Sequence, residues 1–201
     1  MEPLFDAKQL ADLLNHCVQQ WHQGPISTAH KDATLSLAMS LQSHNFSLWH
    51  EEDKARDPHA TDELIAQVKR SIDKLNQQRN DAMEKVDEHI LQALQARGVN
   101  PAQEASLHSE SVGAIVDRLS ILALKVFHMH EQTERTDTDQ AHLDSCAAKL
   151  QVLREQQQDL AQCLGELHDG LLSGQRRFKV YRQMKMYNDP SLNPVLYKNK
   201  S

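Results

Sequence analysis

The segment 61–97 carries apolar residues at the spacing of an amphipathic helix. Because a helix turns about 100° per residue, side chains that recur every three or four positions share one face. Arg79 falls in the centre of that apolar face, where a leucine is expected, and Asn76 lies on its flank. A guanidinium on the core side of a helix is costly unless it is paired, so we expect other side chains or a ligand to meet Arg79. The apolar face is made by Ile65, Val68, Ile72, Leu75, Ala82, Val86 and Ile90, and the adjacent polar strip by Lys69, Asp73, Asn80 and Asp87.

Capping and helix-breaking residues divide the chain into five long helices. The chain has only six Gly and six Pro, and the stretches between them are rich in helix formers. Alternating β-branched runs are missing, so we expect little or no sheet. Short connections favour an antiparallel bundle, and the sequence predicts a single all-α domain over 1–201. The expected helices run from about Asp6 to Trp21, from Ser27 or Thr28 to before Asp57-Pro58, from Thr61 to Arg97, from Ser109 or Ser111 to about Arg135, and from Thr138 or Asp139 to about Gly170; a short helix at 175–187 and an irregular strap at 188–201 follow.

Two other expected helices also place polar residues on core-facing sides. The helix at 111–135 is apolar on two opposite sides, which is typical of a helix buried on both sides. Asp117, Lys125 and His128 lie between those sides, so we expect them to face other helices and not water. The second helix carries a tryptophan, which seldom faces solvent, among polar residues on one arc of about 100°. These residues are Asn45, Trp49, Glu52, Asp53 and Arg56, and together with the first set they predict a polar seam in the core.

Composition limits the classes of protein that fit. The three cysteines are far apart and form no CxxC pair, which fits a reduced, cytoplasmic protein and favours neither a zinc site nor disulfides. The segment MEPLFDAKQL lacks the pattern of a secretory signal, and no apolar run approaches the roughly 20 residues that span a bilayer. Aromatic residues do not alternate with basic ones along a groove, so nucleic acid is not an expected partner.

Charge is distributed unevenly along the chain. Residues 175–201 hold seven basic residues and one acidic residue, a net charge of +6. The rest of the chain has 15 basic and 27 acidic residues, a net charge of −12. The basic tail either docks on the acidic body of its own chain or binds an anionic partner such as a phosphate, a nucleotide or a membrane surface. Two interpretations of the strap at 188–201 stay open. It either packs across the bundle, or it is a lid or a docking element for a partner protein.

Four blocks of sequence resemble a bacterial family called domain of unknown function 4254. They span about residues 45–197 and contain seven of the nine aromatic residues. The resemblance implies a cytoplasmic bacterial protein, often encoded near glycosyltransferases of lipopolysaccharide and surface-glycan assembly. It implies no chemistry. The blocks are NFSLWHEEDKAR (45–56), VKRSIDKLNQQRNDAMEKVDE (68–88), ESVGAIVDRLSILALKVFHM (110–129) and FKVYRQMKMYNDPSLNPVLY (178–197).

Four hypotheses compete for the polar seam. In the first, Asp53, Asp73 and Asp117 pair with Arg56, Arg79 and Lys125 in a closed network that fixes helix register. In the second, the seam binds an anionic small molecule, a phosphosugar or a sugar nucleotide, although no Gly-rich phosphate loop is present. Cations would hold the phosphate, amides would bind hydroxyls and Trp49 would stack on the ligand. The residues of this ligand site are Asn45, Trp49, Glu52, Arg56, Asn76, Arg79, Asn80, Lys125, Lys179 and Arg182.

Metal and catalytic sites are the remaining hypotheses. Asp139-x-x-His142 and His128-x-x-Glu131 place ligand types one turn apart, but the paired Glu-x-x-His motifs of a di-iron bundle are missing. We therefore expect no metal and no cofactor. No GxSxG elbow is present, and no Cys has a convincing His partner. In an enzyme, the acid–base candidates are Asp53, Asp73 and Asp117, with His128 in reserve.

The sequence as a whole favours a binding protein over an enzyme. The leading interpretation is a non-catalytic cytoplasmic binding or accessory protein associated with surface-glycan assembly. The alternative is an enzyme that acts on a phosphorylated sugar or sugar nucleotide. A glycosyltransferase-type protein is a candidate partner, and apolar residues left over on the first and fifth helices suit a homodimer.

Overall fold

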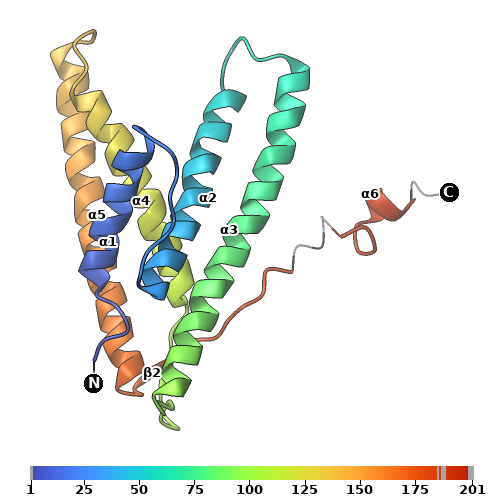
Figure 1. Ribbon diagram of the computed structural model, residues 1–201. Coiled ribbons are helices and arrows are strands. Elements are labelled where there is room, and N and C mark those ends of the chain that lie inside the picture. Colours follow the sequence, from blue (N-terminus) through green and yellow to red (C-terminus); the bar gives the residue numbers. More distant parts are fainter. Residues whose placement is uncertain (1, 185, 187–188, 199–201) are drawn as a thin grey trace.

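The computed structural model describes residues 2–184, 186 and 189–198, which form six helices and two very short strands (Figure 1). The predicted all-α class is confirmed. None of the helices among these residues has the length and apolar composition needed to cross a bilayer. The elements are α1 (Ala7–Trp21), α2 (Ala33–Ala55), α3 (Asp62–Ala96), β1 (Ser106–Leu107), α4 (Val112–Thr133), α5 (Gln140–Leu172), β2 (Arg176–Arg177) and α6 (Pro194–Tyr197).

Side-chain caps fix where the five long helices begin. In each of them, the oxygen of an Asp, Thr or Ser side chain accepts a hydrogen bond from a backbone N–H in the first turn, which would otherwise lack a partner. Four of these caps agree with the sequence prediction. The long helix α3 ends before Gly98, whose φ of 69° is the left-handed conformation common just after a helix. The caps are Asp6, Asp32, Thr61, Ser111 and Asp139.

The predicted start of the second helix at Ser27 or Thr28 is wrong. Asp32 caps α2 instead, its carboxylate accepting from the Leu35 N–H at 3.0 Å. The preceding residues form an extended connection, and the Thr28 carbonyl accepts a hydrogen bond from the Ser36 hydroxyl at 2.9 Å. Figure 1 shows that this connection runs back along the bundle, so α1 and α2 point in the same direction. Antiparallel pairing holds within the α2–α3 hairpin and the α4–α5 hairpin.

The predicted short helix at 175–187 is also wrong in the described residues. Gly174, with a φ of 71°, ends α5, and the chain then enters β2. The parallel pair of β1 and β2 satisfies the backbone there: Ser106 N–H donates to the Gln175 carbonyl at 3.1 Å and His108 N–H to the Arg177 carbonyl at 2.8 Å. This pairing replaces the hydrogen bonds that a helix would have made. Residues 185 and 187 lie outside the described residues.

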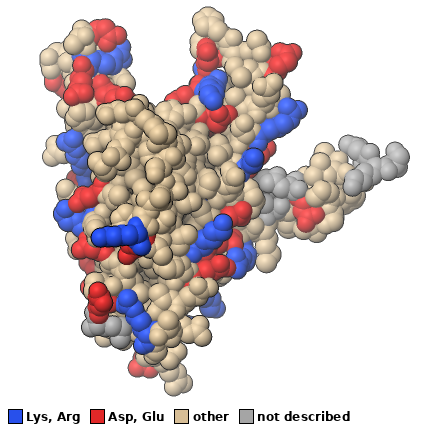
Figure 2. Space-filling model, viewed as in Figure 1, with Lys and Arg blue, Asp and Glu red and all other residues tan. Residues whose placement is uncertain are grey.

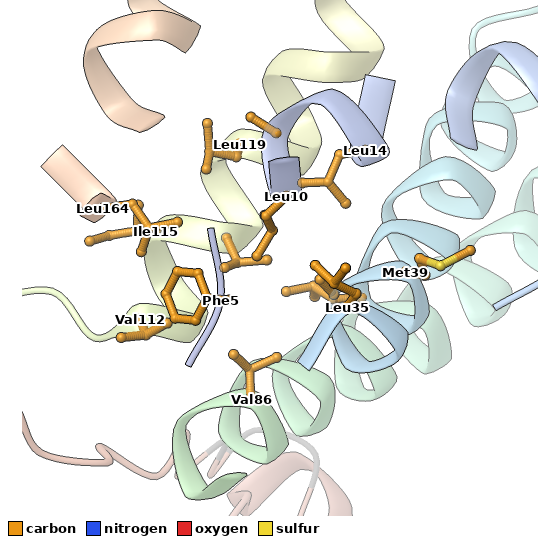
Figure 3. Close-up of a cluster of buried hydrophobic side chains, with 14 of the residues drawn as sticks. Phe5, Leu10, Leu14, Leu35, Met39, Val86, Val112, Ile115, Leu119 and Leu164 are labelled. Atoms are coloured by element: carbon orange, nitrogen blue, oxygen red, sulfur yellow. The ribbon is translucent and has the colours of Figure 1, made fainter. Parts of the chain in front are cut away.

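The core lies where α1 and α4 meet the two hairpins. Helix α4 packs against α1, α2, α3 and α5, as the apolar residues on its two sides predict. Figure 3 shows one cluster to which the N-terminal segment and all five long helices contribute. Burial of such side chains stabilises a fold by roughly 1.5–3 kcal/mol each. The labelled residues are Phe5, Leu10, Leu14, Leu35, Met39, Val86, Val112, Ile115, Leu119 and Leu164.

The two hairpins diverge at their tips. Figure 2 shows a V-shaped outline, with acidic residues on both arms of the V. One tip joins α2 to α3 and the other joins α4 to α5 (Figure 1). The two hairpins contact each other where α4 packs against both α2 and α3.

A glycine sets the approach of α3 to α4. Gly113 is buried, and a Cβ there would lie 2.3 Å from the Met83 carbonyl oxygen and 3.1 Å from Asp87 Oδ1. Real Cβ atoms do not approach a backbone oxygen this closely. The same glycine donates its N–H to Asp87 Oδ1 at 2.6 Å, so a carboxylate of α3 caps the first turn of α4.

We expect Gly113→Ala to lower the free energy of unfolding by about 3 kcal/mol, because the added methyl group pushes α3 away from α4. Urea unfolding followed by circular dichroism measures this. The control is Gly165→Ala on α5, where the new Cβ would lie 3.8 Å from the Ala7 Cβ, an ordinary contact. That variant should be as stable as the unmodified protein or more stable, because Ala favours a helix. A Gly113→Ala protein of unchanged stability would contradict the close contact.

Candidate functional site

Arg79 meets a carboxylate of α4. Its Nε donates to Asp117 Oδ1 at 2.7 Å, and its Nη2 forms an ion pair with Asp117 Oδ2. Such a two-bond pairing of guanidinium and carboxylate is both strong and directional. The Asp117 side chain is 6% exposed and that of Arg79 is 26% exposed. Hydrogen bonding to Asp117 raises the pKa of Arg79 above its ordinary value.

An amide and a hydroxyl complete the shell around Asp117. Asn45 of α2 is buried, and its Nδ2 donates to Asp117 Oδ1 at 2.8 Å and to the Ser120 hydroxyl oxygen. Ser120 in turn donates to the Asp117 carbonyl at 2.9 Å. Asp117 thus ties α2 and α3 to α4 through charged and neutral hydrogen bonds. We call Asn45, Arg79, Asp117 and Ser120 the seam network. On its buried side, the polar groups of these residues bond to one another.

A pocket of about 460 Å³ lies beside the seam network. Arg79 and Asn45 belong to both the network and the pocket wall. Asp53 and Arg56 are exposed, so the pocket opens to solvent on that side. Seven of its lining residues are site residues predicted from the sequence, and three are apolar. The lining consists of Asn45, Leu48, Trp49, Glu52, Asp53, Arg56, Asn76, Arg79, Ile121 and Leu124.

The cations of the pocket are already neutralised. Arg79 pairs with Asp117, and Arg56 donates to Glu52 Oε2 at 2.8 Å. A formal count of Arg56 and Arg79 against Glu52 and Asp53 leaves the lining with no net charge. The pocket therefore offers hydrogen-bonding groups and an indole, but no excess positive charge for an anion.

Trp49 connects the pocket to an aromatic cluster. Its ring stacks on His128 with centroids 4.6 Å apart and planes at 9°. The His128 Nδ1 donates to Glu131 Oε2 at 2.7 Å, and its buried Nε2 lacks a hydrogen-bond partner within the described part of the chain. His50 lies nearby, and its pKa is lowered by burial and by the neighbouring His22 and His128. These contacts hold the Trp49 ring in one orientation.

Several predicted site residues lie elsewhere. Lys125 is exposed and lines a separate pocket between α4 and α5, so the expectation that it does not face water is wrong. Asp73 pairs with Lys69 on the surface of α3. The expected pairings of Asp53 and Asp73 with Arg56 and Lys125 therefore do not form.

The basic residues of the tail are also outside the pocket. Arg182 forms ion pairs with Glu84 and Glu88 of α3, which raise the pKa of its guanidinium, and Lys179 is exposed. Asn80 is half-buried on α3 but is not part of the pocket lining. The predicted cationic strap over the seam is therefore replaced by an anchor on the side of α3.

The sequence analysis missed two buried polar residues, Ser120 of the seam network and Gln42 of α2. Ser120 lies three residues after Asp117, which places it on the same side of α4. Gln42 lies three residues before Asn45, is 0% exposed, and neither of its amide atoms has a partner among the residues described. Gln42 continues the spacing of the predicted set at 45, 49, 52 and 56, and this spacing was the signal that could have identified it.

Comparison with known families decides the classification. The profile described as "Protein of unknown function (DUF4254)" matches residues 35–180, more than half of the chain. The chain belongs to this family. The match begins at residue 35 and not 45, and ends at 180 and not 197, so most of the last resembling block lies beyond it. Comparisons with curated proteins and with solved structures gave no match. The DUF4254 segment contains the whole seam network and the whole pocket lining.

Asp87 is a second buried carboxylate of the DUF4254 fold. It is 4% exposed, and burial raises its pKa to about 6 despite the hydrogen bonds from Ser111 and Gly113. An unfolded chain releases this proton near pH 4. The folded state therefore holds more protons than the unfolded state between about pH 4 and 6.

The protein should lose roughly 2 kcal/mol of stability through Asp87 as pH rises from 4 to above 6. Asp87→Asn removes this loss because the amide oxygen still accepts from Gly113 and never ionises. Unfolding free energies measured at several pH values test this, with the exposed Asp81→Asn on the same helix as the control. A profile of Asp87→Asn that follows the unmodified protein would refute the assignment.

Arg79→Met should lower the free energy of unfolding by about 3 kcal/mol, because it leaves the Asp117 carboxylate buried and uncompensated. Arg118→Met provides the comparison, since Arg118 binds Glu110 with two hydrogen bonds while 55% of its side chain is exposed. Loss of that surface pair should change stability by less than about 1 kcal/mol. Equal effects of the two substitutions in chemical denaturation would show that Asp117 is not effectively buried.

Proposed function

We propose that this chain is a non-catalytic binding protein whose seam pocket takes a hydroxyl-rich ligand, most simply the sugar part of a glycan or glycan precursor. One observation carries the proposal: the pocket combines amides, carboxylates and an indole with cations that are already paired. Hydroxyl groups need both donors and acceptors, and an aromatic ring suits the apolar face of a sugar. Asn76 and Glu52 supply such groups, and Trp49 supplies the ring.

The same pairing argues against a phosphate as the main recognition element. An anion binds best where positive charge is unpaired, and both arginines of the pocket have carboxylate partners. The sugar nucleotide or phosphosugar of the sequence hypothesis then binds through its sugar, with the phosphate in solvent. A cytoplasmic role near glycosyltransferases in bacterial surface-glycan assembly agrees with this ligand class, and that link rests on the family resemblance.

An enzyme that acts on a phosphorylated sugar is the second candidate. Asp117 is buried, is bound by Arg79 and Asn45, and is not part of the pocket lining. Asp53, by contrast, lines the pocket and is exposed, so it is the acid–base candidate that this hypothesis retains. If the protein is an enzyme, Asp53→Asn should bind the ligand and lose turnover.

The test is a thermal-shift series with neutral sugars, the corresponding sugar phosphates and nucleotide sugars. A ligand at a hundredfold excess over its Kd should stabilise the protein by about 2.7 kcal/mol and raise Tm by roughly 5–10 °C. A sugar and its phosphate ester should act alike. A shift with phosphate esters alone would contradict the neutral-ligand proposal and restore the anionic one.

Asn76→Ala should weaken binding about tenfold, because it removes a hydrogen-bonding group from the pocket wall. Asn80→Ala is the matched control, since Asn80 lies one turn further along α3 and outside the lining. Titration calorimetry of both variants compares them directly. Equal losses of affinity in the two variants would place the ligand elsewhere.

A further inference from the structure

A second cavity adjoins the seam pocket across α4. It has a volume of about 710 Å³ and lies between α4, α5 and the segment that leads into α4. Ile121 of α4 lines both this cavity and the seam pocket. One turn further along α4, Leu124 lines the seam pocket, whereas Lys125 lines the second cavity. The two cavities therefore lie on either side of Ile121, and we call the second one the α4–α5 pocket.

The α4–α5 pocket has an apolar floor and a polar rim. Ile115 and Leu160, which belong to the core, are buried beneath it, and Leu122 is half-buried beside them. Ligand pockets commonly combine such an apolar surface with a few polar groups that orient the ligand. The polar groups of the rim therefore decide which class of ligand the pocket can take.

Three polar side chains of the rim are available to a ligand. Lys125, Gln156 and Asp159 are exposed, and their side chains make no hydrogen bond or ion pair within the described part of the chain. The ammonium group donates hydrogen bonds, the carboxylate accepts them and the amide does both. Arg118 is bound to Glu110 by two hydrogen bonds, so the two basic and two acidic residues of the lining balance in charge. Like the seam pocket, this pocket offers donors and acceptors without excess positive charge.

We propose that the ligand of the seam pocket is a chain of two or more sugar units, which crosses α4 at Ile121 and places its further units in the α4–α5 pocket. This inference rests on the proposed function. A sugar chain presents hydroxyl groups and apolar ring faces along its whole length, so neighbouring pockets of the same chemistry suit it better than a single sugar. Units beyond the first add contacts without a second loss of translational freedom, which raises affinity.

The experiment is titration calorimetry of the full chain with neutral sugars of increasing length. The probes are glucose, galactose, mannose and N-acetylglucosamine, each with its linear disaccharide and trisaccharide. In a series that binds, the trisaccharide should bind at least about tenfold more tightly than the single sugar, because its added units enter the α4–α5 pocket. Asn76→Ala should weaken binding of both lengths, because Asn76 lines the seam pocket that both occupy.

Lys125→Ala/Gln156→Ala should remove most of the gain from added units and leave the affinity for the single sugar unchanged. That unchanged affinity also shows that the variant is folded. Lys149→Ala/Gln158→Ala is the matched control, because it removes the same residue types from exposed positions on α5 that do not line the α4–α5 pocket. It should keep the full gain.

A trisaccharide that binds no more tightly than its single sugar would overturn this inference and leave the proposed function standing. A gain that survives Lys125→Ala/Gln156→Ala, or that the control variant also removes, would place the added units elsewhere and would overturn it too. If none of the probes binds at any length, the proposed function fails, and this inference fails with it.

Discussion

The ion pair between Arg79 and Asp117 is the constraint on which the arrangement of three helices depends. Each partner lies on the core-facing side of its helix, where an unpaired charge would be costly. Their contact fixes the register of α3 against α4, and Asn45 adds α2 to the same carboxylate. Gly113 permits the close approach of α3 and α4 on which this contact relies. The pocket beside the pair takes its shape from the three helices held in this way.

A buried ion pair of this kind contributes more to specificity than to stability. Desolvation of the two charges offsets most of their attraction, so an apolar pair of similar size is often equally stable. The buried side-chain amide of Gln42 on α2, which has no hydrogen-bond partner among the described residues, also lowers stability. Asn45 and Arg79 of the seam network also line an open pocket, and this combination supports the binding role that we propose. The pairing of both arginines is the reason that we propose a ligand with neutral hydroxyl groups.

The sequence predicts the features that local chemistry determines. Thr61, Ser111 and Asp139 begin helices as expected, and a guanidinium on an apolar face required a partner, which Asp117 supplies. The start of α2 and the structure after Gly174 could not be predicted, because they depend on how distant segments of the chain pack together. Ser27 is a suitable cap, yet the connection must first run back along α1 before α2 can begin. The segment after Gly174 has helix-forming residues, but its backbone pairs with residues 105–108 instead.

The same distinction separates the predicted residues that lie in the pocket lining from those that lie elsewhere. The stripe on α2 reaches the pocket because its periodicity follows one helix that contacts both α3 and α4. Lys125 was assigned from its position between two apolar faces of α4, and Arg182 from the positive charge of the tail. Neither signal shows which neighbour a long side chain meets. Arg182 forms ion pairs with Glu84 and Glu88 on the outer side of α3.

The most direct test of the central claim is the unfolding free energy of the double variant Arg79→Met/Asp117→Leu. If the pair provides specificity and pocket geometry, the double variant should lie within about 1 kcal/mol of the unmodified protein. A loss as large as that of Arg79→Met alone would contradict this account.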